Sequence, residues 1–171
     1  LLFYLPLAGS AFKKVYYDVN KQRAVSTFVP VEDLVVPYTA SDLTNCERVT
    51  HVVKMSYNEI RTQQLAGFYR DIPLQPAETN IGNSDTIDKE DELEGLSATT
   101  NDMMYELLEC HVSMDMPGFE DEDGYHLPFI ITVDRASNEV LSIRRNYNPN
   151  DPLRTKIQYF VHYKFLPGLG F

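Results

Sequence analysis

Short hydrophobic runs separated by turn-forming residues occupy most of the chain and predict a β-rich fold. Residues 11–20 read as a strand that enters a turn at 18–21, and residues 23–30 follow as its hairpin partner. Pro30 and Pro37 interrupt the next segment. Proline lacks the N–H that a central strand needs, so we expect an edge strand or a surface loop there. Further strands are expected at 48–55, 105–116, 127–134, 140–147 and 156–165.

The last of these strands has the clearest alternation. Its apolar residues are separated by mostly polar neighbours, as in a strand with one buried face. The pattern predicts that this buried face is formed by Ile157, Tyr159, Val161, Tyr163 and Phe165.

One helix is predicted at about 56–67. Ser56 and Glu59 have the spacing of a capping box, in which each side chain bonds the other residue's backbone N–H. Gly67 lies near the expected end, and Pro73 prevents continuation. The predicted class is α+β and β-rich, with antiparallel hairpins, one clear helix and a long acidic loop.

Charge is unevenly distributed along the chain. The formal net charge is -10, yet residues 71–126 alone carry one basic and 16 acidic residues. Within this stretch, residues 75–104 contain too few apolar residues to offset the entropy cost of ordering, so we expect a flexible acidic insert. A tail that docks a basic partner is the alternative.

Composition narrows the class of protein. A chain of 171 residues with 43% hydrophobic residues can build a core, and its negative charge argues against a simple basic nucleic-acid binder. Cys46 and Cys110 are expected to be free thiols. No apolar run reaches the ~18 residues of a membrane span. Both ends read like the interior of a folded protein, so we expect an internal fragment.

Sequence motifs give no support to an enzyme. The four histidines lack HExxH spacing, no CxxC occurs, and GxSxG is absent. The acidic segment 119–125 lacks the later Glu of an EF-hand. We therefore predict no catalytic, cofactor-binding or metal-binding residues. A hydrolase or metalloenzyme that uses the acidic loops is the least favoured hypothesis.

Four basic residues form the one candidate contact site. Arg144 and Arg145 precede the loop 148–152, and Arg154 and Lys156 follow it. If this loop closes a hairpin, the four side chains would cluster near Tyr147 and could contact phosphates. A charged surface rim is the alternative.

Three stretches together resemble one protein family. They are "LPLAGSAFKKVYYD", then "FVPVEDLVVPYTASDLTNCERVTHVVKMSYNEIR" with "LAGFYRDI", and finally "VLSIRRNYNPNDPLRTKIQYFVHYKFLPGLGF". In this order they are similar to the portal proteins (head-tail connectors) of tailed bacteriophages, most closely those of short-tailed phages. The resemblance covers most of the chain outside the acidic insert.

The resemblance implies a non-enzymatic subunit of a ring, typically of twelve copies, at one capsid vertex. Such rings bind the terminase large subunit, tail or adaptor proteins, and capsid or scaffold proteins. Double-stranded DNA passes through them during packaging and ejection, and no membrane is involved. The implied location is the virion, with the host cytoplasm during assembly. The four basic residues would contact DNA or terminase.

The resemblance also implies a division of the chain. Residues 1–74 would form a wing-like β region with a connecting helix, 75–104 the insert, and 105–171 a second, clip-like or adjoining β unit that leads into a helical region. The alternative function is another phage structural component, such as an adaptor or a minor head protein.

Overall fold

The structure is a computed structural model that describes residues 1, 4–18, 22–40, 42–74, 104–119 and 124–165. These residues form two compact units built from interleaved parts of the chain. Unit 1 comprises Leu1–Val52, Glu109–Ile131 and Ile143–Phe171, and unit 2 comprises Val53–Leu108 and Thr132–Ser142. Apart from Met104, the predicted acidic insert lies outside the described residues. The division of the chain implied by the resemblance stays a prediction.

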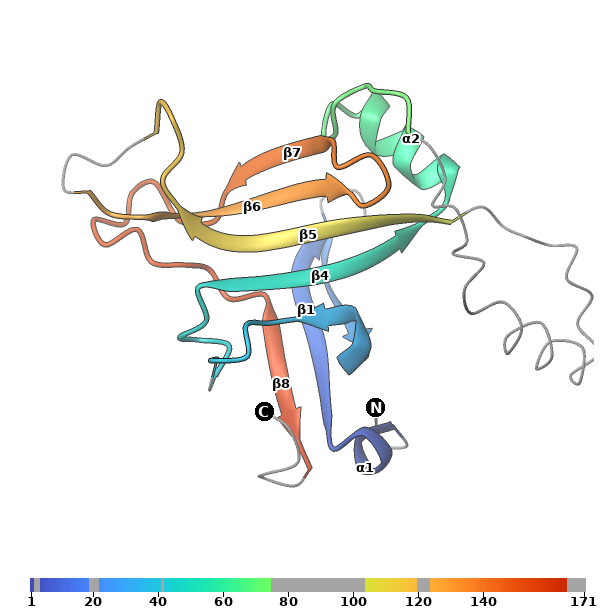
Figure 1. Cartoon of the computed structure of the whole chain (residues 1–171), viewed down its shortest axis with the longest axis vertical. Helices are drawn as coiled ribbons and strands as arrows, with labels where there is room; N and C mark the ends of the chain where they lie inside the picture. The colour runs from blue at the N-terminus through green and yellow to red at the C-terminus, as the bar shows by residue number, and fades with distance from the viewer. Residues whose placement is uncertain (2–3, 19–21, 41, 75–103, 120–123, 166–171) are drawn as a thin grey trace, which may run out of the picture. The chain divides into compact units, whose positions relative to one another are not determined.

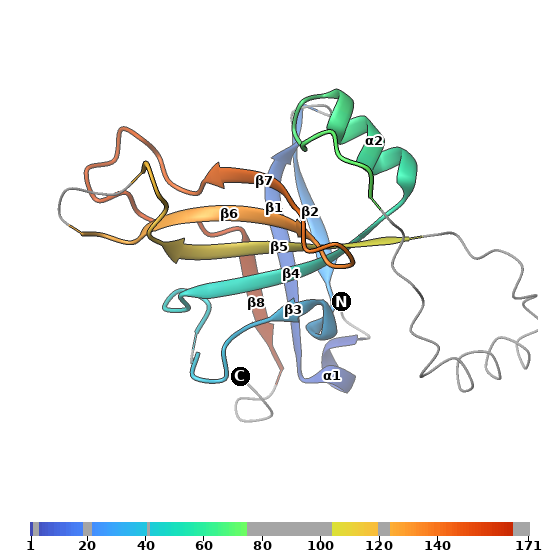
Figure 2. The ribbon, with the colours of Figure 1, turned by 45° about the horizontal axis from the view of Figure 1, so that its top comes forward.

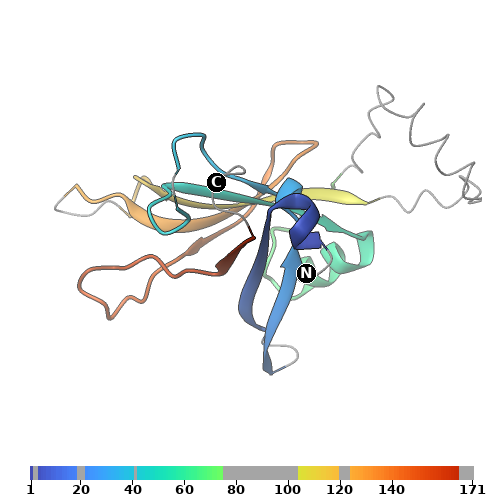
Figure 3. The same ribbon diagram turned by 90° about the horizontal axis from the view of Figure 1, so that it is seen from below.

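A three-stranded antiparallel sheet belongs to unit 1. Its strand order is β2-β1-β8, with β1 at Ser10–Asp18, β2 at Arg23–Val29 and β8 at Phe160–Lys164. The paired β1 and β2 are the two long blue arrows of Figure 3. The predicted hairpin is therefore confirmed, and a strand about 140 residues further along the chain completes its sheet.

A short helix, α1 at Tyr4–Ala8, precedes this sheet and was not predicted. The ring of Tyr4 meets that of Phe28 edge-on with centroids 5.2 Å apart, and its hydroxyl donates to Glu32. Gly9 follows with φ of +73°, a conformation that glycine adopts without strain, and redirects the chain into β1. The apolar start of the chain thus packs beside the hairpin.

The second sheet has five strands in the order β3-β4-β5-β6-β7, and the arrows of Figures 1 and 2 alternate in direction from β4 to β7. The strands span Leu34–Val35, Arg48–Met55, Tyr105–Met114, Leu127–Asp134 and Val140–Arg145. A single 3-10 turn at Val31–Asp33 precedes β3. The two-residue β3 is an edge strand, as the flanking prolines predicted.

The predicted helix is α2 at Tyr57–Leu65 in unit 2, and its capping box is present. The Ser56 hydroxyl accepts from the Glu59 amide at 3.4 Å, and the Glu59 carboxylate accepts from the Ser56 amide at 2.8 Å. These bonds satisfy two backbone donors that a helix start leaves unpaired. The helix buries Ile60 in the apolar cluster of unit 2, together with Tyr105, Leu107 and Leu141.

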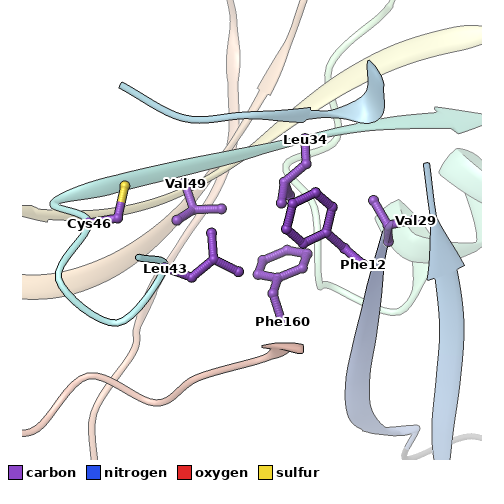
Figure 4. Close-up of a cluster of buried hydrophobic side chains, with 7 residues drawn as sticks. All are labelled: Phe12, Val29, Leu34, Leu43, Cys46, Val49 and Phe160. Atoms are coloured by element: carbon purple, nitrogen blue, oxygen red, sulfur yellow. The ribbon is translucent and has the colours of Figure 1, made fainter. Parts of the chain in front are cut away.

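The apolar core of unit 1 joins segments that are far apart in sequence (Figure 4). The rings of Phe12, from β1, and Phe160, from β8, lie side by side in it. The other buried members come from β2, β3, β4 and the segment before β4: Val29, Leu34, Leu43, Cys46 and Val49. Early, central and late parts of the chain therefore share one core.

The predicted buried face of the last strand was largely wrong, although the partly buried Tyr159 does pack against the core of unit 1. Strand β8 covers only Phe160–Lys164, and Phe160 is 7% exposed whereas Val161 is 45% exposed. Ile157 and Phe165 are exposed as well. The reason is register: Phe160 pairs with Lys14, whose side chain points inward, so Phe160 shares that inward face. A shift of one residue exchanges the two faces of a strand.

This register can be tested by truncating neighbouring side chains. Phe160→Ala should lower the free energy of unfolding by roughly 3–5 kcal/mol, because it leaves a cavity in the core. The matched change Val161→Ala, at an exposed position, should cost less than about 1 kcal/mol. Urea unfolding of both variants measures the difference. A larger loss for Val161→Ala would show that the opposite face is buried.

Candidate partner- and DNA-contact site

The loop between β7 and β8 closes on itself, but it does not form the expected hairpin, because the two strands belong to different sheets. Its ends meet where the Ile157 amide donates to the Asn146 carbonyl at 3.0 Å. Inside the loop, the side chains of Asn148 and Asp151 accept from backbone amides two to four residues later. The amide and then the hydroxyl of Thr155 lower the pKa of the Asp151 carboxyl. Such turns are local, because Asn and Asp side chains bond backbone amides a few residues further along the chain.

Arg144 and Arg145, at the end of β7, line one cavity of about 350 Å³. The Arg145 guanidinium lies 5.3 Å from the centre of the Phe119 ring, within reach of a cation–π interaction. The remaining lining residues are apolar: Met116, Phe129 and Ile143. Both arginines line this cavity, and the guanidinium of Arg145 lies over its aromatic ring Phe119.

Arg154 and Lys156 do not line this cavity. The Lys156 ammonium donates to the Cys46 carbonyl at 2.9 Å and is half-buried, and burial lowers its pKa. The backbone of Arg154 has φ of +47°, and its amide donates to the Asp151 carbonyl. The four predicted residues thus separate into an arginine pair and two residues held by the loop. Their contact with DNA or terminase stays a prediction.

A buried charged cluster in unit 1 was missed by sequence reasoning. The Lys14 ammonium of β1 donates to both Glu109 oxygens of β5, at 2.7 and 2.8 Å. His111, two residues along the same strand, lies 2.7 Å from Glu109 through its Nε2. Burial opposes ionisation of Glu109, but the bond with His111 and the charge of Lys14 outweigh it and lower the carboxyl pKa.

Burial lowers the pKa of two imidazoles of this cluster. Burial lowers the pKa of His111, against the opposing effect of its bond to Glu109. Burial, followed by the charge of Lys14, lowers the pKa of His51 to about 4. Within the described part of the chain, the buried Nδ1 of His51 has no hydrogen-bond partner. The His51 ring meets the Phe160 ring edge-on at 5.7 Å, so it packs against the apolar core of unit 1.

The sequence did carry a weak signal for this cluster. Glu109 and His111 are two positions apart on a strand, which places their side chains on one face. Nothing local identified Lys14, 95 residues away, as the partner. The charges of Lys14 and Glu109 compensate each other, as in a structural ion pair.

The described residues contain no group of three or more His, Cys, Asp or Glu side chains placed to hold a metal ion. The acids Glu120–Asp123, which gave the loop its superficial likeness to a calcium site, lie outside the described residues. No helix in the described ranges is long and apolar enough to cross a membrane.

Comparison with known proteins adds no assignment to this geometry. No model of a known protein family matches the chain, and the curated proteins likewise contain no match.

The buried histidine predicts acid sensitivity. As pH falls, the unfolded chain protonates His51 near its ordinary pKa of 6.5, whereas the folded chain does so only near 4. The contribution of neutral His51 to the free energy of unfolding is therefore complete above pH 6.5. It falls by up to about 3 kcal/mol as the pH is lowered from 6.5 to 4. Chemical unfolding as a function of pH measures the loss.

His51→Phe keeps a ring at this position and should shrink the loss between pH 6.5 and 4. His126→Phe, at an exposed histidine, is the matched control and should leave the profile unchanged. Equal profiles for the two variants would contradict the assignment of the acid sensitivity to His51.

Proposed function

We propose that the chain is part of a portal-ring subunit of a tailed bacteriophage, located at the capsid vertex and acting in DNA packaging and ejection. The observation that carries the proposal is the likeness of three long stretches, in order, to portal proteins. In this role the protein has no catalytic activity of its own. It positions terminase, tail or adaptor proteins and DNA on one ring.

The packing of unit 1 supports the proposal. The first resembling stretch supplies Phe12, the second supplies Leu34 and Val49, and the third supplies Phe160. All four side chains are buried in one core. Residues that pack together constrain one another, so a likeness spread over these stretches concerns one folded unit rather than three separate motifs.

Charge is compatible with a conduit for DNA. A channel has to let the duplex slide, and contacts between basic side chains and phosphates would hold it. The chain has a net charge of -10, and the half-buried Lys156 is bonded to a backbone carbonyl. The Arg144–Arg145 pair remains the best candidate for contact with DNA or terminase. In this proposal, residues 1–74 belong to the wing and 105–171 to a clip-like or adjoining region.

Assembly of the full-length protein tests this function. Native mass measurement and electron microscopy should give closed rings that bind the terminase large subunit. A clean monomer at micromolar concentration, with no rings, would overturn the proposal. Rings that bind tail proteins but no terminase would instead favour an adaptor.

Substitution of the arginine pair tests the contact site. Arg144→Gln with Arg145→Gln should leave rings intact and change the salt dependence of DNA packaging, because two cations are removed from the proposed contact. Arg48→Gln, at an exposed position of β4, is the matched control and should leave the salt dependence of packaging unchanged. In-vitro packaging at several salt concentrations measures the effect. Identical salt dependence in all variants would make the pair a charged rim.

A further inference from the structure

The sheet of unit 1 has two open edges. Its order is β2-β1-β8, so among the described residues no strand pairs with the outer side of β2 or of β8. Proteins usually protect such edges with lysine, proline, bulges or very short strands, because unpaired backbone groups recruit other chains. Strand β2, "RAVSTFV", is seven residues long and contains neither lysine nor proline. Its residues 24–29 carry no charge at all.

One face of the same sheet carries several exposed apolar side chains beside Lys13. The pairings Lys13↔Phe28, Lys13↔Val161 and Val15↔Ser26 place odd residues of β1 and β8 and even residues of β2 on this face. Its large exposed side chains are Val15, Tyr17, Phe28 and Val161. Exposed apolar side chains beside open strand edges are typical of an interaction surface.

The two edges are complementary to each other. Strands β2 and β8 both run antiparallel to β1, so they are parallel to one another. The β8 strand of a second copy can therefore extend the sheet beyond β2 without reversal of its direction. Arg23 begins β2 and Lys164 ends β8, so these cations lie at opposite ends of such a joint. No like charges of the two strands face each other across it.

Head-to-tail pairing also accounts for both edges at once. Pairing of β2 with β2, or of β8 with β8, about a two-fold axis would cover one edge and leave the other open. Pairing of β2 with β8 of the next copy covers both edges with a single interface. Repetition of one such heterologous contact closes a ring when the rotation permits.

We propose that β2 of each copy pairs in parallel with β8 of the next copy, so that the three-stranded sheets join into a continuous belt. This inference rests on the proposed ring function. Backbone hydrogen bonds along the joint supply affinity, and the face with exposed apolar side chains continues across it and supplies specificity.

Cysteine pairs in the full-length protein test the joint. Ser26 of β2 and Val161 of β8 are exposed and lie on the same face of the sheet. Neighbouring strands hold Cα atoms at distances that a disulfide can span. Chains with Ser26→Cys and Val161→Cys should therefore give a ladder of covalent multimers on oxidation. Ser26→Cys with Tyr163→Cys covers a register two residues away.

Each single-cysteine variant and the parent chain, which retains Cys46 and Cys110, are the controls and should give no ladder. Dimers from Ser26→Cys alone would show two-fold pairing and overturn the proposal. Rings by electron microscopy without a ladder from either cysteine pair would overturn the joint while leaving the ring function standing. A ladder formed by open assemblies that bind no terminase would support the joint and overturn the ring function.

An edge-blocking substitution provides an independent measurement. Ser26→Lys places a charge on the exposed edge strand and should abolish ring assembly, while circular dichroism shows an unchanged fold. Ala136→Lys, in the exposed turn between β6 and β7, adds the same charge elsewhere and should assemble normally. Normal assembly of both variants would overturn the joint.

Discussion

The ion pair between Lys14 and Glu109 is the constraint on which the architecture of unit 1 depends. Both side chains are largely buried, and removal of one partner from such a pair leaves an uncompensated charge that costs about 3–5 kcal/mol. Lys14 must therefore point inward. Because residues alternate along β1, Phe12 also points inward, and the pairing of Lys14 with Phe160 turns that ring into the same core. One buried charge thus determines which face of a three-stranded sheet is apolar core.

How much of the fold the sequence predicts depends on how local the controlling interaction is. The hairpin of β1 and β2, the strand β4 and the capped helix α2 depend on residues within a few positions of one another, and they were predicted. The buried face of β8 was not predicted, because apolar residues occupy both odd and even positions of "FVHY". The choice between them comes from Lys14, about 146 residues earlier.

The same distinction between local and distant interactions applies to the candidate site. The loop after β7 closes through turns formed by its own Asn and Asp side chains, so its closure could be inferred from sequence. The orientation of Lys156 could not, because its acceptor is the carbonyl of Cys46, 110 positions away. The likeness to portal proteins motivates the proposed function, and of the four basic residues proposed as contacts Arg144 and Arg145 line a cavity.

The order in which unit 1 can form during synthesis follows from its strand order. Strands β1 and β2 are made before β8, yet the ring that lies beside Phe12 belongs to β8. Lys14 meets its partner Glu109 once β5 is made, but the inward face of the hairpin is completed only when Phe160 of β8 arrives. Contacts of such long sequence separation slow folding and expose strand edges to other chains. Nascent copies growing side by side therefore have an extended interval in which wrong pairing competes with correct closure.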